Sequence, residues 1–150
     1  MTISFKKKIK GTYYPPGDKS ISHRILILAG QAIGKSQISN LLEGEDVLNT
    51  LKVMQILGAN INKKDGKYNI FGIPPGALFQ PTKSLDFGNS GTGIRLLSGV
   101  ISSNNIKAKL IGDRSLNARP MRRVTDHLKK IGAIIKLRKD SFPPISIQGV

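Results

Sequence analysis

The sequence predicts an α/β fold, in which helices and short strands alternate along a chain of 150 residues. Two observations predict it. Segments with helical apolar periodicity alternate with short segments typical of strands, and the order of these segments occurs twice along the chain. Hydrophobic residues make up 39% of the chain, which is enough for a buried core, and the length suits one domain.

The first half of the chain is expected to fold as helix, strand, helix, strand, strand. A proline-rich turn at 15–17 leads into the first helix, and Gly58 is the left-handed stop expected after the second. Because carboxylates stabilise a helix N-terminus, Glu43, Glu45 and Asp46 are expected to open that second helix. The expected elements of this unit, about residues 15–80, are a helix over 20–34, a strand over 36–41, a helix to Leu57, and two strands up to Gly72 joined by the charged turn KKDGK.

The second half is expected to repeat this order after a short leading strand. Pro120 suits the first position of a helix, where its missing N–H costs nothing, which makes Arg119 the entrance residue. Gly132 is the expected stop of the same helix. The expected elements of this unit, about residues 81–150, are a strand over 83–87, a helix over 90–104, a strand over 106–111, the helix ending near Gly132, and two strands up to Gly149 joined by RKDSFPP.

Two pairs of glycines mark the repeat. Gly58 and Gly132, which end matching helices, are 74 positions apart, and Gly72 and Gly149, which end matching strands, are 77 positions apart. A nearly fixed offset with the same order of elements indicates internal duplication. Chance similarity between two common α/β patterns is the alternative.

The chain is strongly basic, with 24 basic against 9 acidic residues and a formal net charge of +15. Such a surplus predicts anionic partners: nucleic acid, an acidic membrane or phosphorylated small molecules. Aromatic residues make up only 5% of the chain and tryptophan is absent, so stacking platforms for single-stranded nucleic acid are poorly supplied. Many of the lysines are equally well explained as solvated surface residues.

Several kinds of site and location are excluded or disfavoured. The chain has no cysteine, which excludes disulfides, zinc–thiolate sites and a thiol nucleophile, and fits the cytoplasm, where we expect the protein. No apolar run approaches the ~20 residues of a membrane span, and the N-terminal MTISFKKKIK lacks the apolar segment of a secretory signal. His23 and His127 lack metal-ligand spacing, so no metal site is expected.

The segment GQAIGKS resembles a phosphate-binding loop but does not match the pattern. That loop needs four residues between its glycines, and only three separate Gly30 from Gly34. We therefore interpret Gly34 as the residue that ends the first helix.

The first helix start, PGDKSISHR, gathers groups that bind anions. Ser20 and Arg24 are four residues apart, which places them on one face of a helix, and Lys19 directly precedes them. A helix N-terminus adds unpaired N–H groups and partial positive charge. This start could therefore offer amides, a hydroxyl, an ammonium and a guanidinium to one anion.

Two further helix starts have the same character. In DFGNSGTGIRLL, glycines such as Gly91 let the backbone approach a ligand, and Asn89, Thr92 and Arg95 supply polar side chains. In GDRSLNARPMRRV, Arg119 could clamp a carboxylate or phosphate through two parallel hydrogen bonds. Taken singly, each start is equally well explained by ordinary caps and a solvated arginine; three in one basic chain favour anion binding.

These three segments, in this order and spacing, resemble those of 5-enolpyruvylshikimate-3-phosphate synthases, from about Lys10 to the last residue. The related UDP-N-acetylglucosamine enolpyruvyl transferases lack the Asp-Lys-Ser-x-Ser-His-Arg signature and typically use a cysteine. The resemblance implies an inside-out α/β barrel, in which each of two domains holds three βαβαββ units. About two units would be present here, and residues 1–14 would contribute an opening strand to the other domain.

The resemblance also implies a reaction and its substrates. The 5-hydroxyl of shikimate 3-phosphate attacks C2 of phosphoenolpyruvate while C3 gains a proton, and the tetrahedral intermediate expels phosphate. No metal or organic cofactor is implied, and neither is a nucleic acid or membrane partner. Both substrates are multiply anionic, which would account for the basic surplus. A full-length enzyme of this kind is expected to be a monomer in the cytoplasm.

Motif positions imply roles for individual residues. Lys19 resembles the catalytic lysine that touches both substrates. The implied contacts of shikimate 3-phosphate are Lys19, Ser20 and Arg24; those of phosphoenolpyruvate are Lys19, Gly91 and Arg119; and Asn89, Thr92 and Arg95 are further candidates that line the same pocket.

The chain is much shorter than these enzymes, which are roughly three times as long. The missing part would hold the third unit, nearly all of the other domain and the groups that move protons. We therefore expect this chain alone to bind substrates weakly and not to turn them over. The resemblance further implies that Gly91 leaves room for the inhibitor glyphosate. Two alternatives remain open from the sequence: a basic nucleic-acid-binding module, and a non-catalytic fragment with an intact fold.

Overall fold

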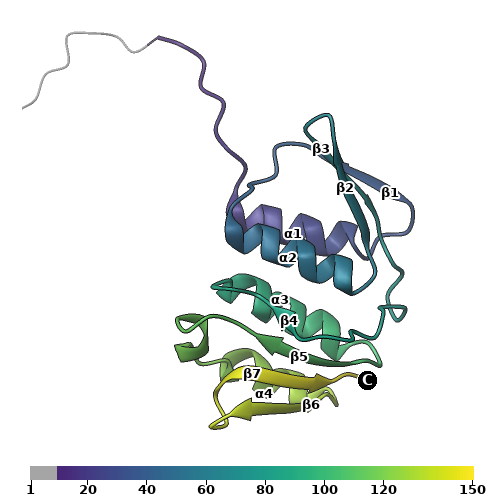
Figure 1. Ribbon diagram of the computed structural model, residues 1–150, viewed down its shortest axis with the longest axis vertical. Helices are drawn as coiled ribbons and strands as arrows, with labels where there is room; N and C mark the ends of the chain where they lie inside the picture. The colour runs from purple at the N-terminus through teal and green to yellow at the C-terminus, as the bar shows by residue number, and fades with distance from the viewer. Residues whose placement is uncertain (1–9) are drawn as a thin grey trace, which may run out of the picture.

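The structure, a computed structural model, describes residues 10–150 and confirms the mixed α/β fold (Figure 1). Its helices and strands alternate along the chain as the sequence predicts. In chain order the elements are α1 (Lys19–Ala29), β1 (Lys35–Ile38), α2 (Glu45–Ile56), β2 (Asn60–Lys64), β3 (Lys67–Phe71), β4 (Leu85–Asp86), α3 (Gly91–Ser102), β5 (Lys107–Ile111), the 3₁₀ helix η1 (Leu116–Ala118), α4 (Arg122–Lys130), β6 (Ile134–Arg138) and β7 (Phe142–Gln148).

The strands form two separate sheets with the same internal order. The first sheet has the order β1-β3-β2, and all its pairs are antiparallel. The second has the order β4-β5-β7-β6, in which β4 and β5 are parallel and the other pairs antiparallel. Each sheet contains a hairpin, β2–β3 in the first and β6–β7 in the second. The second strand of each hairpin lies between the first strand and an earlier strand, which is β1 in the first sheet and β5 in the second.

Both hairpins close against the end of a helix through a glycine. A Cβ on Gly72 would lie 2.4 Å from the carbonyl oxygen of Ala29, at the end of α1. A Cβ on Gly149 would lie 2.3 Å from that of Ile101, in the last turn of α3, and 2.1 Å from that of Asn104. Only glycine lets a strand pass so close to helix carbonyls.

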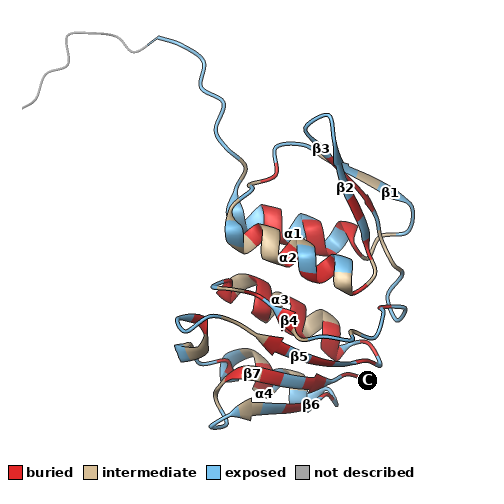
Figure 2. Ribbon diagram, viewed as in Figure 1, coloured by how far each residue is buried: buried red, intermediate tan, exposed pale blue. Residues whose placement is uncertain are grey.

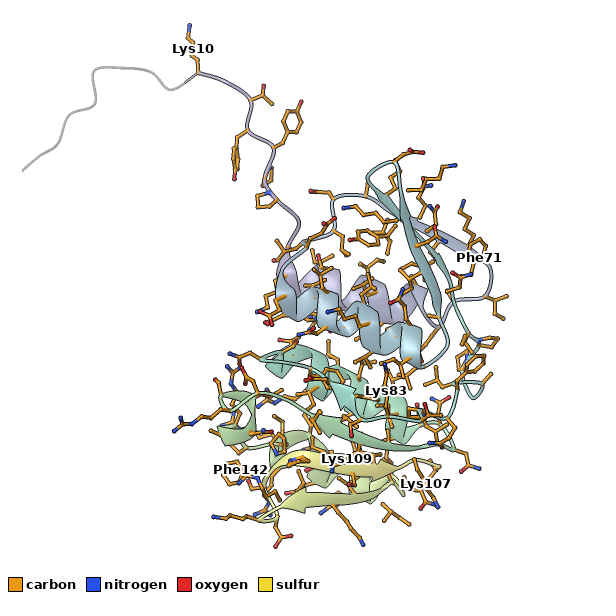
Figure 3. All side chains as sticks on the ribbon, viewed as in Figure 1. Lys10, Phe71, Lys83, Lys107, Lys109 and Phe142 are labelled. Atoms are coloured by element: carbon orange, nitrogen blue, oxygen red, sulfur yellow. The ribbon has the colours of Figure 1, made fainter. Side chains whose placement is uncertain are left out.

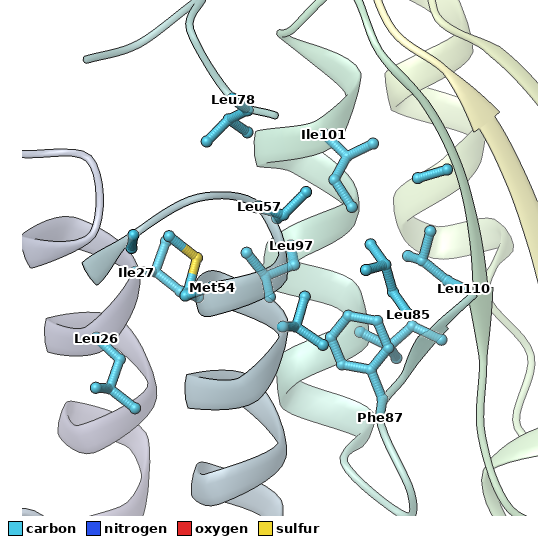
Figure 4. Packing of buried hydrophobic residues seen from close by; sticks show 14 of the residues in the cluster. Leu26, Ile27, Met54, Leu57, Leu78, Leu85, Phe87, Leu97, Ile101 and Leu110 are labelled. Carbon is cyan, nitrogen blue, oxygen red and sulfur yellow. The ribbon is translucent and has the colours of Figure 1, made fainter. Parts of the chain in front are cut away.

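The helices are packed between the two sheets and share one hydrophobic core (Figure 2). Met54 and Leu57 of α2 lie between Leu26 and Ile27 of α1 and Leu97 of α3 (Figure 4), and all five are 6% exposed or less. The apolar stripes that predict helices in the sequence are thus used for contacts between helices as well as with sheets. This packing holds the N-terminal ends of α1, α2 and α3 at fixed positions relative to one another.

The first helix is shorter than expected. It ends at Ala29 and is capped by Gly30, whereas Gly34 lies in the following turn with φ of 93°. A Cβ on Gly30 would lie 2.4 Å from the terminal methyl group of Met54, so a side chain there would require Met54 to move. Glu43 was expected to open the second helix, but α2 begins at Glu45. The Glu43 carboxylate instead pairs with the ammonium of Lys63.

Pro120 does not open a helix, which corrects a second expectation. Helix α4 begins at Arg122, and Arg119 is the residue that ends η1. The backbone of Arg119 is extended, with φ of −92° and ψ of 127°, as expected of a residue before proline. The segment Phe142–Pro144 belongs to β7 rather than to the hairpin turn, which is narrower and includes Lys139 and Asp140 at positive φ.

The chain before α1 has no strand in its described part. Residues 10–18 have no regular secondary structure, and the rest of the expected opening strand, at residues 1–9, lies outside the described residues. Among residues 10–150, none of the helices has the length and apolar character needed to cross a membrane.

We predict that Gly149→Ala lowers the free energy of unfolding of the chain by about 1–3 kcal/mol, because the methyl group would overlap two helix carbonyls. Gly99→Ala is the matched control, since nothing lies within 4 Å of a Cβ at this helical position. It should be neutral or stabilising by up to about 1 kcal/mol. Urea unfolding followed by circular dichroism measures both. Equal effects of the two substitutions would contradict the close contact.

Candidate anion-binding site at the helix N-termini

The first turn of α1 presents the predicted basic and hydroxyl groups to solvent. Asp18 caps the helix, its Oδ1 accepting a hydrogen bond of 2.7 Å from the amide of Ile21. Lys19, Ser20 and Arg24 are exposed, and the Arg24 guanidinium donates to the carbonyl of Ser20 at 3.0 Å. The structure therefore places Ser20 and Arg24 one turn apart on the same side of α1, as their spacing predicts, and Lys19 directly precedes them.

The turn before α1 is fixed against the segment that leads into α2. A Cβ on Gly17 would lie 2.1 Å from the carbonyl oxygen of Asn40, so only glycine fits there. The hydroxyl of Ser22 accepts a hydrogen bond of 3.0 Å from the amide of Leu42. The glycine and the inward serine of PGDKSISHR thus hold the helix start in place, while Lys19, Ser20 and Arg24 remain exposed.

The Lys19 ammonium forms an ion pair with the Asp46 carboxylate in the first turn of α2. The lysine side chain is 52% exposed and that of Asp46 is 24% exposed. An exposed pair of this kind contributes about 0–1 kcal/mol to stability and exchanges easily. From the sequence, Asp46 was expected only to stabilise the N-terminus of α2; its pairing with Lys19 depends on the packing of α1 against α2.

At the start of α3, the side chain of Arg95 folds back over the first turn of the helix. Ser90 is fully buried and caps α3, accepting a hydrogen bond of 3.0 Å from the amide of Gly93. Arg95 donates to the carbonyl of Gly91 at 2.9 Å and to that of Pro120 at 3.1 Å. The guanidinium thus joins the start of α3 to the segment that precedes α4.

Arg119 completes this arrangement from the end of η1. Its guanidinium donates to the Oδ1 of Asn89 at 2.6 Å and to the hydroxyl of Ser115 at 3.3 Å. A Cβ on Gly91 would lie 2.9 Å from an Nη1 of both Arg119 and Arg95, so the glycine leaves the space that the two guanidinium groups occupy. The structure therefore brings together residues predicted from two motifs, Asn89, Gly91 and Arg95 from the first and Arg119 from the second; Thr92 lies beside them, half-buried in the first turn of α3.

Arg95 and Arg119 form an arginine cluster whose positive charge is not compensated by a carboxylate among the described residues. Burial lowers the pKa of Arg95, and the positive charges of Arg119 and Arg123 lower it further. Within residues 10–150, neither Arg95 nor Arg119 forms a salt bridge with a carboxylate; their partners are carbonyl, amide and hydroxyl oxygens. Cations held close together without a counter-charge, beside the amides of a helix N-terminus, are a candidate binding site for an anion. Arg123 was not a candidate from the sequence, where nothing distinguishes it from a solvated arginine.

The two groups of residues lie on either side of α2. No hydrogen bond among the described residues joins Lys19, Ser20 or Arg24 directly to the arginine cluster. The link runs through α2: Asp46 pairs with Lys19, and the amide of Asn49, one turn later, donates to the carbonyl of Phe87 at 3.4 Å, in the loop before α3. Asn49 was missed at the sequence level, because this contact spans 38 residues of chain.

Comparison with known proteins matches this arrangement to one family. A sequence profile described as EPSP synthase (3-phosphoshikimate 1-carboxyvinyltransferase) matches residues 3–150. The chain belongs to the EPSP synthase family. The 3-phosphoshikimate 1-carboxyvinyltransferases of Ruegeria sp. (strain TM1040) and of Bradyrhizobium diazoefficiens are 47% and 48% identical to it, over 99% and 94% of this chain and 33% and 30% of their own lengths.

Solved structures of the EPSP synthase family agree with the fold. An EPSP synthase from Acinetobacter baumannii superimposes with a TM-score of 0.88 at 40% sequence identity, covering 93% of this chain and 32% of its own. The chain therefore spans about a third of the length of the relatives it matches.

The histidine of the first motif is buried. His23 is 0% exposed, and its Nδ1 lies 2.8 Å from the hydroxyl oxygen of Thr50, whereas His127 is exposed. Within the described part of the chain, no three His, Cys, Asp or Glu residues are grouped as metal ligands. Burial lowers the pKa of His23, an effect that Asp46 opposes and that Lys19 strengthens.

We predict that His23 makes the folded chain sensitive to acid. Its folded pKa is lowered from 6.5, so the unfolded chain takes up this proton more readily, and the free energy of unfolding should fall as pH drops below 6.5. In His23→Asn this part of the pH dependence should disappear, whereas His127→Asn should retain it. Urea unfolding at several pH values measures it, and identical pH profiles of the two variants would refute the assignment.

Proposed function

We propose that this chain is part of an enzyme that transfers the enolpyruvyl group of phosphoenolpyruvate to the 5-hydroxyl of shikimate 3-phosphate and releases phosphate. The observation that carries the proposal is the pair of guanidinium groups, Arg95 and Arg119, held over a glycine at the start of α3 without a carboxylate partner. Such a pair suits a small ligand with both a carboxylate and a phosphate.

Phosphoenolpyruvate would bind at the start of α3. Arg119 would hold it through parallel hydrogen bonds, in an orientation fixed by Asn89. The main chain of Gly91 would lie against it, and Thr92 and Arg95 would line the same pocket. Because the donors are already in position, charge that develops on the departing phosphate would be stabilised without rearrangement of the site.

Shikimate 3-phosphate would bind at the start of α1. Ser20 would donate its hydroxyl and Arg24 its guanidinium to the phosphate, beside the free amides of the helix N-terminus. Lys19 would leave Asp46 and contact both substrates, acting as the catalytic residue of this chain. A multiply charged substrate competes well with a single exposed carboxylate for this ammonium.

The remaining parts of the site would lie outside this chain. We propose that the two units, about residues 15–80 and 81–150, are two copies of the βαβαββ unit of an inside-out α/β barrel, and that residues 1–14 join the other domain. The complete enzyme would work as a monomer in the cytoplasm, without a metal, an organic cofactor or a nucleic acid. This chain alone would be inactive, because it supplies one side of the cleft.

Activity is best tested in a chimera, in which residues 1–150 replace the matching third of the Acinetobacter baumannii EPSP synthase. We predict that the chimera releases phosphate from the two substrates and that the 150-residue chain alone does not. In the chimera, Arg119→Lys should raise the KM for phosphoenolpyruvate about 10- to 100-fold, because lysine cannot form the paired hydrogen bonds.

Arg122→Lys is the matched control for that substitution. Arg122 is exposed on α4, and its side chain pairs with Asp126 rather than with a residue at the start of α3. It should change the KM less than about twofold. A folded chimera that binds nucleic acid but releases no phosphate would contradict the proposed function, as would normal turnover by the chain alone.

Gly91 should determine sensitivity to glyphosate in the same chimera. Gly91→Ala places a methyl group 2.9 Å from both guanidinium groups, so they must move and the pocket becomes smaller. We predict that the substitution weakens inhibition by glyphosate about tenfold or more, and the control Gly99→Ala leaves it unchanged. Inhibition assays at fixed substrate concentrations measure this, and unchanged inhibition in Gly91→Ala would remove the steric argument.

A further inference from the structure

A buried polar contact joins α1 to α2 directly beneath the candidate site. His23 of α1 and Thr50 of α2 are both 0% exposed, and the Nδ1 of the histidine lies 2.8 Å from the hydroxyl oxygen of the threonine. The Thr50 hydroxyl also lies 3.4 Å from the carbonyl of Asp46, to which it can donate. Its oxygen then accepts from the histidine, which requires a proton on Nδ1.

The same threonine also fixes the approach of α3. A Cβ on Gly93 would lie 2.6 Å from the Thr50 hydroxyl oxygen and 2.7 Å from that of Ser90, the cap of α3. The glycine therefore allows the first turn of α3 to pack directly on the hydroxyl of Thr50. One side chain of α2 thus contacts the inner faces of the helices that lie on either side of it.

Each member of this contact lies about one helical turn or less from a residue of the candidate site. His23 is four residues after Lys19 and adjacent to Arg24, and Gly93 is two residues after Gly91. Thr50 is four residues after Asp46, the partner of Lys19. A change in the contact would therefore shift the start of α1 relative to the start of α3.

We propose that His23 and Thr50 are a positioning pair that sets the distance between the two substrate-binding halves of the site. The pair touches neither substrate and acts by fixing α1 and α3 against α2. This inference rests on the proposed function for its kinetic consequences, whereas the structural coupling does not depend on it. Loss of the pair should weaken binding of both substrates together, although all the ligand-facing side chains are retained.

The kinetic test uses Thr50→Val and Thr50→Ser in the chimera. Valine keeps the shape and removes the hydroxyl, leaving the histidine nitrogen unpaired, so the KM for both substrates should rise about fivefold to tenfold. Serine keeps the hydroxyl and should restore both KM values to within about twofold. Thr125→Val is the matched control, because Thr125 is equally buried but donates only to the carbonyl of Met121 within α4.

A second measurement works on the 150-residue chain without catalysis. In two-dimensional NMR spectra, Thr50→Val should shift the amide signals of both Lys19 and Gly91, whereas Thr125→Val should leave the amide of Lys19 unchanged. The ring nitrogens of His23 should show the Nδ1–H tautomer, and this signature should be lost in Thr50→Val and kept in Thr50→Ser.

The outcomes separate the two proposals. An inactive chimera whose NMR signals shift as expected would refute the proposed function and support the positioning pair. An active chimera in which Thr50→Val and Thr125→Val have equal KM values would overturn the positioning pair, as would shifts confined to α2 or a KM change that serine does not restore.

Discussion

Positive charge held without a counter-charge is the constraint on which the site depends. Arg95 and Arg119 converge on Gly91, and their hydrogen bonds go to carbonyl, amide and hydroxyl oxygens. A carboxylate would stabilise them better but would also occupy the place of an anionic ligand. Burial lowers the pKa of Arg95, and the neighbouring positive charges of Arg119 and Arg123 lower it further, so the helix packing must supply the free energy that holds the two groups together.

Glycines make this packing possible at positions where a methyl group would meet an atom of the next element. Gly17 fixes the turn before α1, Gly91 leaves room for two guanidinium groups, and Gly93 brings α3 onto Thr50. Gly72 and Gly149 close the two hairpins against helix ends. The contacts at Gly17, Gly91 and Gly93 lie at helix starts, so the geometry of the site depends on the absence of side chains at these positions as well as on the side chains that face the ligand.

The sequence predicts those features that depend on neighbouring residues. Helix starts were expected at Ser20 and Ser90, and α1 and α3 begin within one residue of them, at Lys19 and Gly91. The expectation at Pro120 was wrong because proline suits a turn as well as a first helical position, and only the packing of η1 decides between them. The approach of Arg119 to Asn89 spans 30 residues and has no local signal. The burial of His23 does have a local signal, because His23 lies with Ser22, Leu26 and Ile27 on the buried stripe of α1.

The two halves of the site hold their cations in different ways, and this difference bears on how they would bind. Arg119 is fixed by a neutral amide, so an anion can reach it without displacing a charge. Lys19 is paired with Asp46, so a ligand at α1 must compete with a carboxylate for this ammonium. A singly charged anion gains little from that exchange in water, whereas a doubly charged phosphate gains more and also meets Arg24 and the helix amides. The ion pair at α1 therefore favours a phosphorylated ligand there, and the arginine cluster at α3 can accept a smaller anion.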